Sequence, residues 1–401
     1  MYRNFTFVSD DSPLKSKGSG ISVLLYNILL SQKDHHQINV LTFCRDSKAS
    51  TEEIISDNRG IKLHICDRKF QKTYRLVRLG ILKKIVEFIS FLLYVPAFKK
   101  TIDRKDNIYV TVVGASVRPV CKAWFLQKMD RTSKHCLYIV DDLELINQKQ
   151  ANKIELFLIR LFLKSTIQNC DLLINISEGL KDLYLKNYAK DSLVLPPHFV
   201  KRDPLPQKID QDKNQYTFLY TGGLNLLYND SLKYFADVID ELNAAVDRDI
   251  HYHLRIQTYS SLADFQQLNF NSASVSYSTT DNRDDLLKIY QQCDCFLVPY
   301  SFAAEDYGMV ITSFPQKVAE IIQYGRKILI FGPQYSSVNK FFSAQGIGFI
   351  CNEQSKDMLK ETIRKSMMSD LEVDSYVHAY EKFLSAAAVG KVFKEIIKSI
   401  N

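Results

Sequence analysis

Long apolar runs free of charge are absent from this chain of 401 residues. A membrane-spanning helix requires about 20 largely uncharged residues. The nearest approach, residues 80–98, is interrupted by Lys83, Lys84 and Glu87, so we expect no membrane span. The N-terminus leads directly into an apolar segment and carries no secretory signal pattern, which favours a cytoplasmic protein.

Paired cysteines are absent as well. The eight cysteines are scattered without the paired spacing of a zinc site, and Cys293 and Cys295 are too close together to chelate zinc by themselves. We therefore expect reduced cysteines, mostly buried as small apolar groups. The formal net charge of +7 is mild for this length, and we expect no nucleic-acid partner.

Short apolar segments alternate with helical patterns along the chain. Strands alternating with helices predict α/β domains with parallel, doubly wound sheets, and the length favours two such domains. The expected strands are residues 4–8, 38–43, 62–65, 108–113, 137–140 and 172–176 in the first half, and 216–220, 253–257, 273–277, 295–299 and 327–331 in the second.

A polar, proline-bearing stretch without apolar periodicity separates the two halves. This stretch, residues 201–215, is interpreted as an interdomain linker. The first domain is then expected at residues 1–200 and the second at residues 216–381, where the alternation of strands and helices begins again. The tail, about residues 382–401, is expected to be helical.

The most informative segment is residues 289–333, which predicts a strand, a polar loop, a helix and a second strand. Pro315 suits the first turn of that helix because it lacks the N–H that would stay unpaired there. The helix is expected to run to about Tyr324, and Gly325 supplies a left-handed stop. A helix that begins after a strand presents free N–H groups, so we interpret the junction as a phosphate site. Glu320 can accept two hydrogen bonds from a diol such as ribose, although it could also be a solvated face residue.

This segment resembles the nucleotide-sugar site of glycosyltransferases with two Rossmann-like domains (the GT-B architecture), and most of all that of glycosyltransferase family 4. Members carry the pattern S-F-P-x-K-x-x-E, followed by x-G-x-P. An alternative pattern, E-x7-E, does not fit, because Thr312 stands at its first glutamate. The resemblance implies that the matching residues bind a nucleotide-diphospho-sugar: Ser313, Phe314, Pro315, Lys317 and Glu320.

A pair of glycines after the first strand of the second domain matches the family's diphosphate loop. Gly222 and Gly223 would let the backbone approach a phosphate closely. Many relatives place an arginine and a lysine just after this turn, whereas residues 224–230 contain no cation. The charge of the leaving diphosphate must then be met by Lys317, by backbone N–H groups or by a cation of the first domain.

Two further loops are expected near the sugar and the acceptor. Gly18, Ser19 and Gly20 resemble the family's glycine-rich loop between the first strand and the first helix, although many solvent-exposed loops share this pattern. Glu305 and Asp306 lie in the loop before the phosphate helix, where they either face the sugar or belong to a solvated loop.

Two carboxylates end the strand at residues 137–140, at the strand end where doubly wound sheets carry their functional residues. Asp141 or Asp142 could act as general base on an acceptor hydroxyl, or stabilise positive charge at the sugar ring. The alternative is that one of them only caps the helix that follows. The sequence does not choose between the two residues.

Basic residues gather within residues 68–105 around the apolar segment 80–98. That segment is interpreted either as a core helix on the first sheet, or as an amphipathic helix drawn to anionic lipid at the inner face of the membrane.

The resemblance therefore implies a glycosyltransferase that moves a sugar from a nucleotide-diphospho-sugar to a glycan or lipid-linked acceptor. It also implies retention of configuration, a setting in bacterial surface polysaccharide synthesis, a last helix that crosses back onto the first domain, and no bound metal or other cofactor. Two alternatives stay open: a nucleotide-sugar epimerase of the same architecture, and a binding subunit that has lost turnover, which the missing cations favour.

Overall fold

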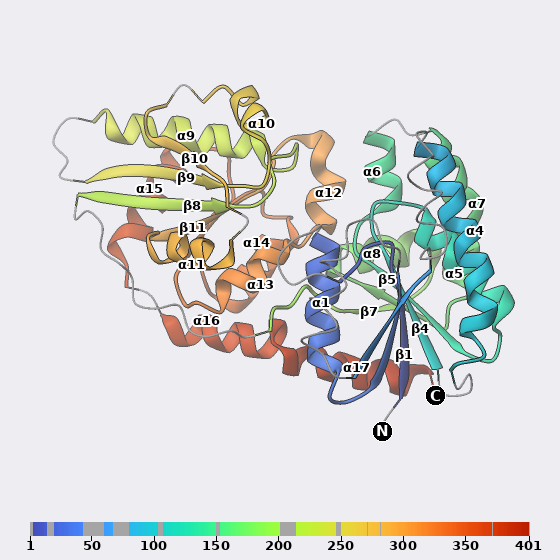
Figure 1. The fold of residues 1–401 in the computed structure, drawn as a ribbon. Coiled ribbons are helices and arrows are strands. Elements are labelled where there is room, and N and C mark those ends of the chain that lie inside the picture. The colour runs from blue at the N-terminus through green and yellow to red at the C-terminus, as the bar shows by residue number, and fades with distance from the viewer. Residues whose placement is uncertain are drawn as a thin grey trace. The chain divides into compact units, whose positions relative to one another are not determined.

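The computed structural model describes residues 3–13, 20–42, 60–66, 80–102, 107–149, 153–200, 214–245, 250–270, 272–280, 282–370 and 372–400. The chain divides into two compact units (Figure 1). Unit 1 comprises Met1–Val200 and Ala386–Asn401, and unit 2 comprises Lys201–Ser385. Of the expected linker, residues 201–213 lie outside the described residues.

Unit 1 is built on a seven-stranded sheet in the order β3-β2-β1-β4-β5-β6-β7. Each pair of neighbouring strands is parallel. The first six strands match the sequence expectations to within a few residues, whereas the short β7 is not predicted. The strands are β1 (Asn4–Val8), β2 (Gln37–Thr42), β3 (Ile61–Ile65), β4 (Asn107–Val113), β5 (Lys134–Ile139), β6 (Leu172–Asn175) and β7 (Ser192–Val194).

Helices cover both faces of this sheet. Successive side chains of a strand point to opposite faces, and β1 shows the result: Phe7 belongs to the core beneath α1 and α17, whereas Val8 belongs to the core beneath α4. The last helix, α17, contacts α1, and its Phe393 ring lies 5.2 Å from the ring of Phe5. The helices are α1 (Gly20–Gln32), α4 (Gly80–Phe98), α5 (Arg118–Met129), α6 (Leu143–Lys149), α7 (Lys153–Gln168), α8 (Glu178–Tyr188) and α17 (Ala386–Ile400).

Unit 2 repeats the plan with a six-stranded sheet in the order β10-β9-β8-β11-β12-β13. All of its neighbouring strands are parallel. Residues of β8, β9 and β12 form one core with α9 and α15. The strands are β8 (Gln215–Thr221), β9 (His251–Gln257), β10 (Val275–Ser278), β11 (Cys295–Pro299), β12 (Lys327–Phe331) and β13 (Phe349–Cys351).

The helices of unit 2 from α9 to α14 lie between these strands in the sequence, as a doubly wound sheet requires, and α15, α16 and η3 follow the last strand. They are α9 (Asn229–Asn243), α10 (Leu262–Gln267), α11 (Arg283–Gln291), the 3-10 turn η2 (Ala304–Asp306), α12 (Tyr307–Thr312), α13 (Gln316–Ile322), α14 (Ser337–Gln345), α15 (Lys356–Met368), α16 (Val373–Ala379) and the π-helical turn η3 (Tyr380–Leu384). The predicted fold class, α/β with two doubly wound parallel sheets, is confirmed. Within the part of the chain that the structure describes, no helix is long and apolar enough to span a membrane.

The segment between β11 and β12 differs from its expected form in two respects. The polar loop before the phosphate helix contains η2 and α12. Pro315 is the N-cap of α13, with φ −70° and ψ 132°, and is not part of the first turn. The stop is as predicted, because Gly325 has a φ of +56°.

The core interpretation of residues 80–98 is confirmed for the end of α4 that the structure describes in full. Its side chains pack on the sheet of unit 1, with Phe91, Val95 and Phe98 all 2% exposed or less. Ile89 and Leu93 remain outside at 45% and 64% exposure. Pro96 lies within the last turn of α4.

Candidate functional site

The predicted donor-binding residues converge on one edge of the sheet of unit 2. β11 lies between β8 and β12, and all three run parallel. Their carboxyl ends therefore meet at one edge, the place where open α/β sheets bind ligands. Gly222 and Gly223 follow β8, and the residues from Glu305 to Pro315 follow β11. We call this the donor edge.

The turn from Ser313 to Pro315 is held from both sides. The buried Tyr300 hydroxyl, at the end of β11, donates to the Ser313 carbonyl over 3.2 Å. Phe314 is 8% exposed, and its ring contacts that of Phe341 edge-on at 5.4 Å. Burial raises the pKa of the Tyr300 phenol well above its ordinary value, so this hydroxyl stays a donor at neutral pH. The sequence locates the start of this helix to within one residue, because proline lacks the N–H that the interior of a helix needs.

Glu320 lies on the buried side of α13. It is only 3% exposed, and its Oε2 accepts a hydrogen bond from Lys317 Nζ over 3.0 Å. The Lys317 side chain is 39% exposed. The interpretation of Glu320 as a solvated face residue is therefore wrong. A buried carboxylate paired with a partly exposed ammonium is suited to exchanging one hydrogen-bond partner for another.

The glycine pair after β8 is enclosed by tyrosines. A Cβ at Gly222 would lie 2.8 Å from the Tyr220 hydroxyl, and a Cβ at Gly223 only 2.4 Å from that of Tyr259. The Tyr220 hydroxyl donates to the Gly223 carbonyl over 2.7 Å, whereas the Tyr259 ring is 81% exposed. A side chain at Gly222 would therefore meet the buried Tyr220 hydroxyl, whereas one at Gly223 would only displace the exposed Tyr259 ring. The side chains that surround this turn offer neutral hydroxyl groups.

A pair of tyrosines at the donor edge escaped the sequence analysis. Tyr307 opens α12 directly after Glu305 and Asp306, and its ring lies 4.8 Å from that of Tyr335, which follows β12. Tyr307 is 51% exposed, Glu305 is exposed and Asp306 is buried. The one signal in the sequence is that Tyr307 and Tyr335 each follow a strand, and that these two strands are neighbours in the sheet.

Asp141 and Asp142, the two candidate catalytic residues of unit 1, lie in different environments. Asp142 Oδ1 accepts a hydrogen bond from the Leu145 backbone N–H over 2.9 Å, so Asp142 caps α6. Asp141 has no such bond. Burial, with a smaller contribution from the charge of Asp142, raises the pKa of Asp141 to about 6. A carboxylate whose pKa lies close to neutral pH is suited to general base catalysis.

Asp141 lies beside the start of α1. Its Oδ2 is 3.7 Å from the position of a Cβ on Gly114, and the Ile21 side chain is 2.1 Å from that position. Gly114 therefore lets α1 approach the end of β4. Of the expected glycine-rich loop, Gly20 begins α1, and Gly18 and Ser19 lie outside the described residues.

Among the described residues, no three His, Cys, Asp or Glu side chains are grouped so that they could hold a metal ion. The expectation that no metal or other cofactor takes part stays a prediction.

Comparison with solved structures shows the fold of the whole chain. Sucrose-phosphate synthase from Thermosynechococcus elongatus matches at 12% identity with a TM-score of 0.64, covering 99% of this chain and 100% of that one. The lipopolysaccharide outer core galactosyltransferase WaaB matches at 14% identity with a TM-score of 0.62, covering 98% and 99%. The catalytic domain of starch synthase IV from Arabidopsis thaliana, bound to ADP and acarbose, matches at 9% identity with a TM-score of 0.66, covering 99% of each chain.

These similarities show that the chain has the GT-B fold. No protein-family model and no curated protein sequence matches it. The resemblance to glycosyltransferase family 4 stays a prediction.

Proposed function

We propose that the protein is a glycosyltransferase, which binds a nucleotide-diphospho-sugar at the donor edge of unit 2 and transfers the sugar to a glycan or lipid-linked acceptor bound by unit 1. The observation that carries the proposal is that Gly223 and the Ser313 turn follow the ends of neighbouring parallel strands, with the buried Glu320 in the helix that begins at that turn. The fold, which the chain shares with several glycosyltransferases over nearly its whole length, supports it.

At the donor edge the diphosphate would lie against the backbone of Gly222 and Gly223. Lys317 would swing away from Glu320 toward the phosphates, and the carboxylate released in this way would accept hydrogen bonds from the ribose hydroxyls. Tyrosine hydroxyl groups and backbone N–H groups would supply the remaining donors. A single lysine neutralises less charge than the pair of cations expected in relatives, so we expect a modest turnover rate.

At unit 1 the acceptor hydroxyl would be activated by Asp141. This carboxylate would take the proton, or stabilise the positive charge that develops at the sugar ring. Transfer with retention of configuration, a hexose as the sugar, and a role in surface polysaccharide synthesis on the cytoplasmic side of a bacterial membrane belong to the same proposal.

The outward face of α7 supports contact between unit 1 and an anionic membrane. Ile154, Phe157 and Leu161 recur at helical spacing and are 64%, 66% and 56% exposed. The single acidic residue of this helix, Glu155, is turned inward and accepts the Val117 backbone N–H over 2.9 Å. An apolar stripe with only basic charge beside it matches the surface of an anionic bilayer.

Basic side chains flank that stripe. Lys153, Arg160 and Lys164 are exposed, and none of them forms an ion pair with a described residue. A second copy of the chain is a poor occupant, because two such faces would bring like charges together. We therefore propose that α7, in place of the segment 68–105, carries the membrane contact. α5 contacts both α4 and α7, and the three helices are labelled together in unit 1 (Figure 1).

Sedimentation with vesicles tests the membrane contact. The protein should sediment with vesicles that contain phosphatidylglycerol and much less with pure phosphatidylcholine. Phe157→Glu should abolish this binding, and Met368→Ser, which changes an exposed apolar residue of unit 2, should leave it unchanged. Equal binding by wild type and Phe157→Glu would remove α7 from the proposal.

Donor incubations test the enzymatic proposal. The chain is incubated with UDP-, GDP-, dTDP- and CMP-linked sugars, alone and with lipid-linked acceptors, and the products are separated. Released nucleotide with a glycosylated acceptor supports the transferase. An isomerised sugar in the incubation without acceptor would indicate an epimerase. The absence of cations in residues 224–230 favours a second candidate, a binding subunit without turnover, which tight nucleotide binding with no product from any donor would support.

A further inference from the structure

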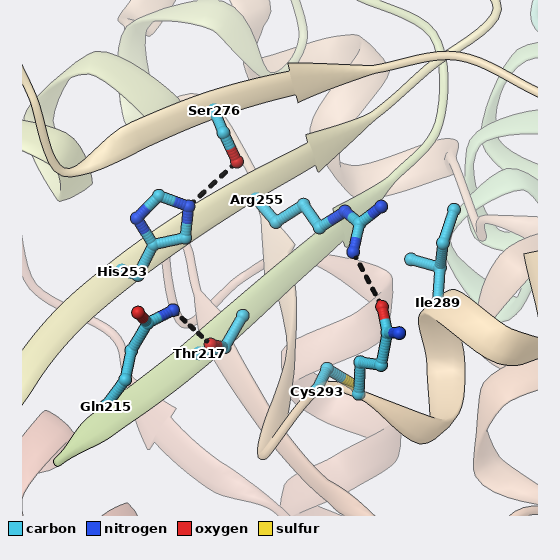
Figure 2. A pocket seen from close by; sticks show the side chains of 8 residues that line it. Gln215, Thr217, His253, Arg255, Ser276, Ile289 and Cys293 are labelled. Carbon is cyan, nitrogen blue, oxygen red and sulfur yellow. Dashed lines mark hydrogen bonds between the residues drawn. The ribbon is translucent and has the colours of Figure 1, made fainter. Parts of the chain in front are cut away.

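A polar hollow of about 130 Å³ lies on one face of unit 2, against three neighbouring strands and α11 (Figure 2). β8, β9 and β10 run side by side, with Thr217 paired to His253 and Arg255 paired to Ser276. We call this cavity the Arg255 hollow. Its polar lining consists of Gln215, Thr217, His253, Arg255, Ser276 and Gln292.

The hollow is unusual for its place in the fold. Parallel strands that are covered on both faces generally read as continuous apolar runs. On β9 the alternate residues Leu254 and Ile256 are fully buried, whereas His253 and Arg255, on the opposite face, are only partly buried. One face of these strands is therefore polar and incompletely filled.

Arg255 places a positive charge in this cavity without a counter-charge. Its Nε donates to Ser278 Oγ over 3.3 Å, and its Nη1 donates to Gln292 Oε1 over 3.0 Å. Both acceptors are neutral, and among the described residues no carboxylate pairs with this guanidinium. Only two of the five N–H groups of an arginine are used in these bonds. A partly buried charge generally requires a partner of opposite charge.

The other side chains of the hollow add uncharged donors. Gln215 Nε2 donates to Thr217 Oγ1 over 3.0 Å, which leaves the Thr217 hydroxyl hydrogen available. His253 Nε2 and Ser276 Oγ are 2.8 Å apart, and Figure 2 shows this pair on the same side of the strands as Arg255. Burial lowers the pKa of His253, so its ring is neutral at neutral pH. A cation surrounded by hydroxyl groups is typical of an oxyanion site.

The hollow is distinct from the donor edge. Gln215 is the first residue of β8, whereas Gly222 and Gly223 follow the last residue of that strand. Arg255, the charged residue of the hollow, pairs with Leu219, three residues before Gly222. At about 3.3 Å per residue this is roughly 10 Å along the strand, so a phosphoryl group held by Arg255 would not touch the glycine pair. The inference below stands independently of the proposed function.

We propose that the Arg255 hollow binds a tetrahedral oxyanion, namely a phosphoryl group, with the guanidinium of Arg255 as its charge partner and the hydroxyl groups of Thr217 and Ser276 as further donors. The phosphoryl group belongs either to free phosphate or to a phosphomonoester. The volume of the cavity accommodates a phosphate ion, and its lining contains no acidic side chain that would repel one.

Calorimetric titration of the full chain with inorganic phosphate tests this site, and glycerol 3-phosphate in a parallel titration distinguishes the free ion from a monoester. Arg255→Gln should weaken phosphate binding at least tenfold. Arg364→Gln, which removes an exposed guanidinium from α15 of the same unit, should leave it unchanged. Thr217→Val keeps the shape and the charge of the hollow and should weaken binding several-fold, so the test does not depend on one variant.

Two results would overturn the inference. One is that neither inorganic phosphate nor glycerol 3-phosphate gives any heat of binding up to tens of millimolar. The other is phosphate affinity that survives in Arg255→Gln but falls in Glu320→Gln, because the anion would then lie at the donor edge. Unchanged phosphate binding in Glu320→Gln, combined with loss in Arg255→Gln, supports the hollow whether or not the chain transfers sugars.

Discussion

Replacing Asp141 by asparagine removes a carboxylate whose protonation the fold has shifted toward neutral pH. If Asp141 takes the acceptor proton, Asp141→Asn should lower kcat/KM by about 100-fold to 10,000-fold, the usual contribution of a positioned base, with donor affinity nearly unchanged. Asp142→Asn is the matched control, because asparagine caps a helix about as well as aspartate and α6 should keep its Leu145 N–H bond.

The pH profile gives this prediction a magnitude. With the pKa of Asp141 raised to about 6 by burial, about 97% of the carboxylate is ionised at pH 7.5 and about a tenth at pH 5. The kcat/KM of wild type should therefore fall about tenfold between these values. An aspartate at the ordinary pKa of 3.8 would remain mostly ionised at pH 5. Asp142→Asn removes a charge that raises the pKa of Asp141, so its profile should shift to lower pH.

The same shift has a consequence for stability. Because the folded-state pKa of Asp141 lies above its unfolded value of 3.8, the native state binds the proton more tightly, and the free energy of unfolding falls as pH rises through about 6. The charged form then costs about 1–3 kcal/mol at pH 7.5. Asp141→Asn should raise the free energy of unfolding by that amount in urea denaturation. Full activity in Asp141→Asn, or a flat profile down to pH 5, would refute the reasoning.

Three further predictions concern other parts of the chain. Gly223→Ala should weaken binding of the nucleoside diphosphate at least tenfold in calorimetry, because the methyl group would keep the phosphate away from the backbone. The melting temperature should hardly change, since the exposed Tyr259 ring can move away from the methyl group. Burial lowers the pKa of His198 from 6.5 to about 4, so the neutral imidazole stabilises the fold above pH 6.5. Between pH 6.5 and pH 4 the free energy of unfolding of wild type should therefore fall by about 3 kcal/mol more than that of His198→Leu. An equal fall in both proteins would contradict this. Phe393→Ala should lower the free energy of unfolding by about 3–5 kcal/mol, because the Phe393 ring is 1% exposed and packs against the ring of Phe5. A loss below about 1 kcal/mol would show that α17 contributes little to the stability of unit 1.

The fold could be predicted from sequence because its signals are local. The strand at residues 295–299 has the bounds that the sequence predicts, and Gly325 has the left-handed conformation that its position predicts. α12 was missed because its six residues are too few for a helical period to be recognised. β7 was missed because its three residues are too few to show the alternation of a strand.

The candidate site could be predicted only in part. Local patterns located Glu320 and the glycine pair, but the sequence could not choose between Asp141 and Asp142, because the choice depends on which of them meets the N–H groups of α6. It also could not find Tyr259 over Gly223, or the isolated charge of Arg255. These features arise from side chains that are distant in sequence and that only the packed strands bring together.

The central claim is that the buried carboxylate of Glu320 holds the ribose of a donor nucleotide. Nucleoside diphosphates (UDP, GDP, dTDP and CDP) are first screened by thermal stabilisation, since saturating ligand raises stability by several kcal/mol. The nucleotide that stabilises the protein most is then titrated calorimetrically into wild type, Glu320→Gln and Glu305→Gln. A hydrogen bond to a charged group contributes about 1.5–3 kcal/mol, so Glu320→Gln should bind about 10-fold to 100-fold more weakly. Glu305→Gln should bind as wild type does. Equal affinity in wild type and Glu320→Gln would contradict the account.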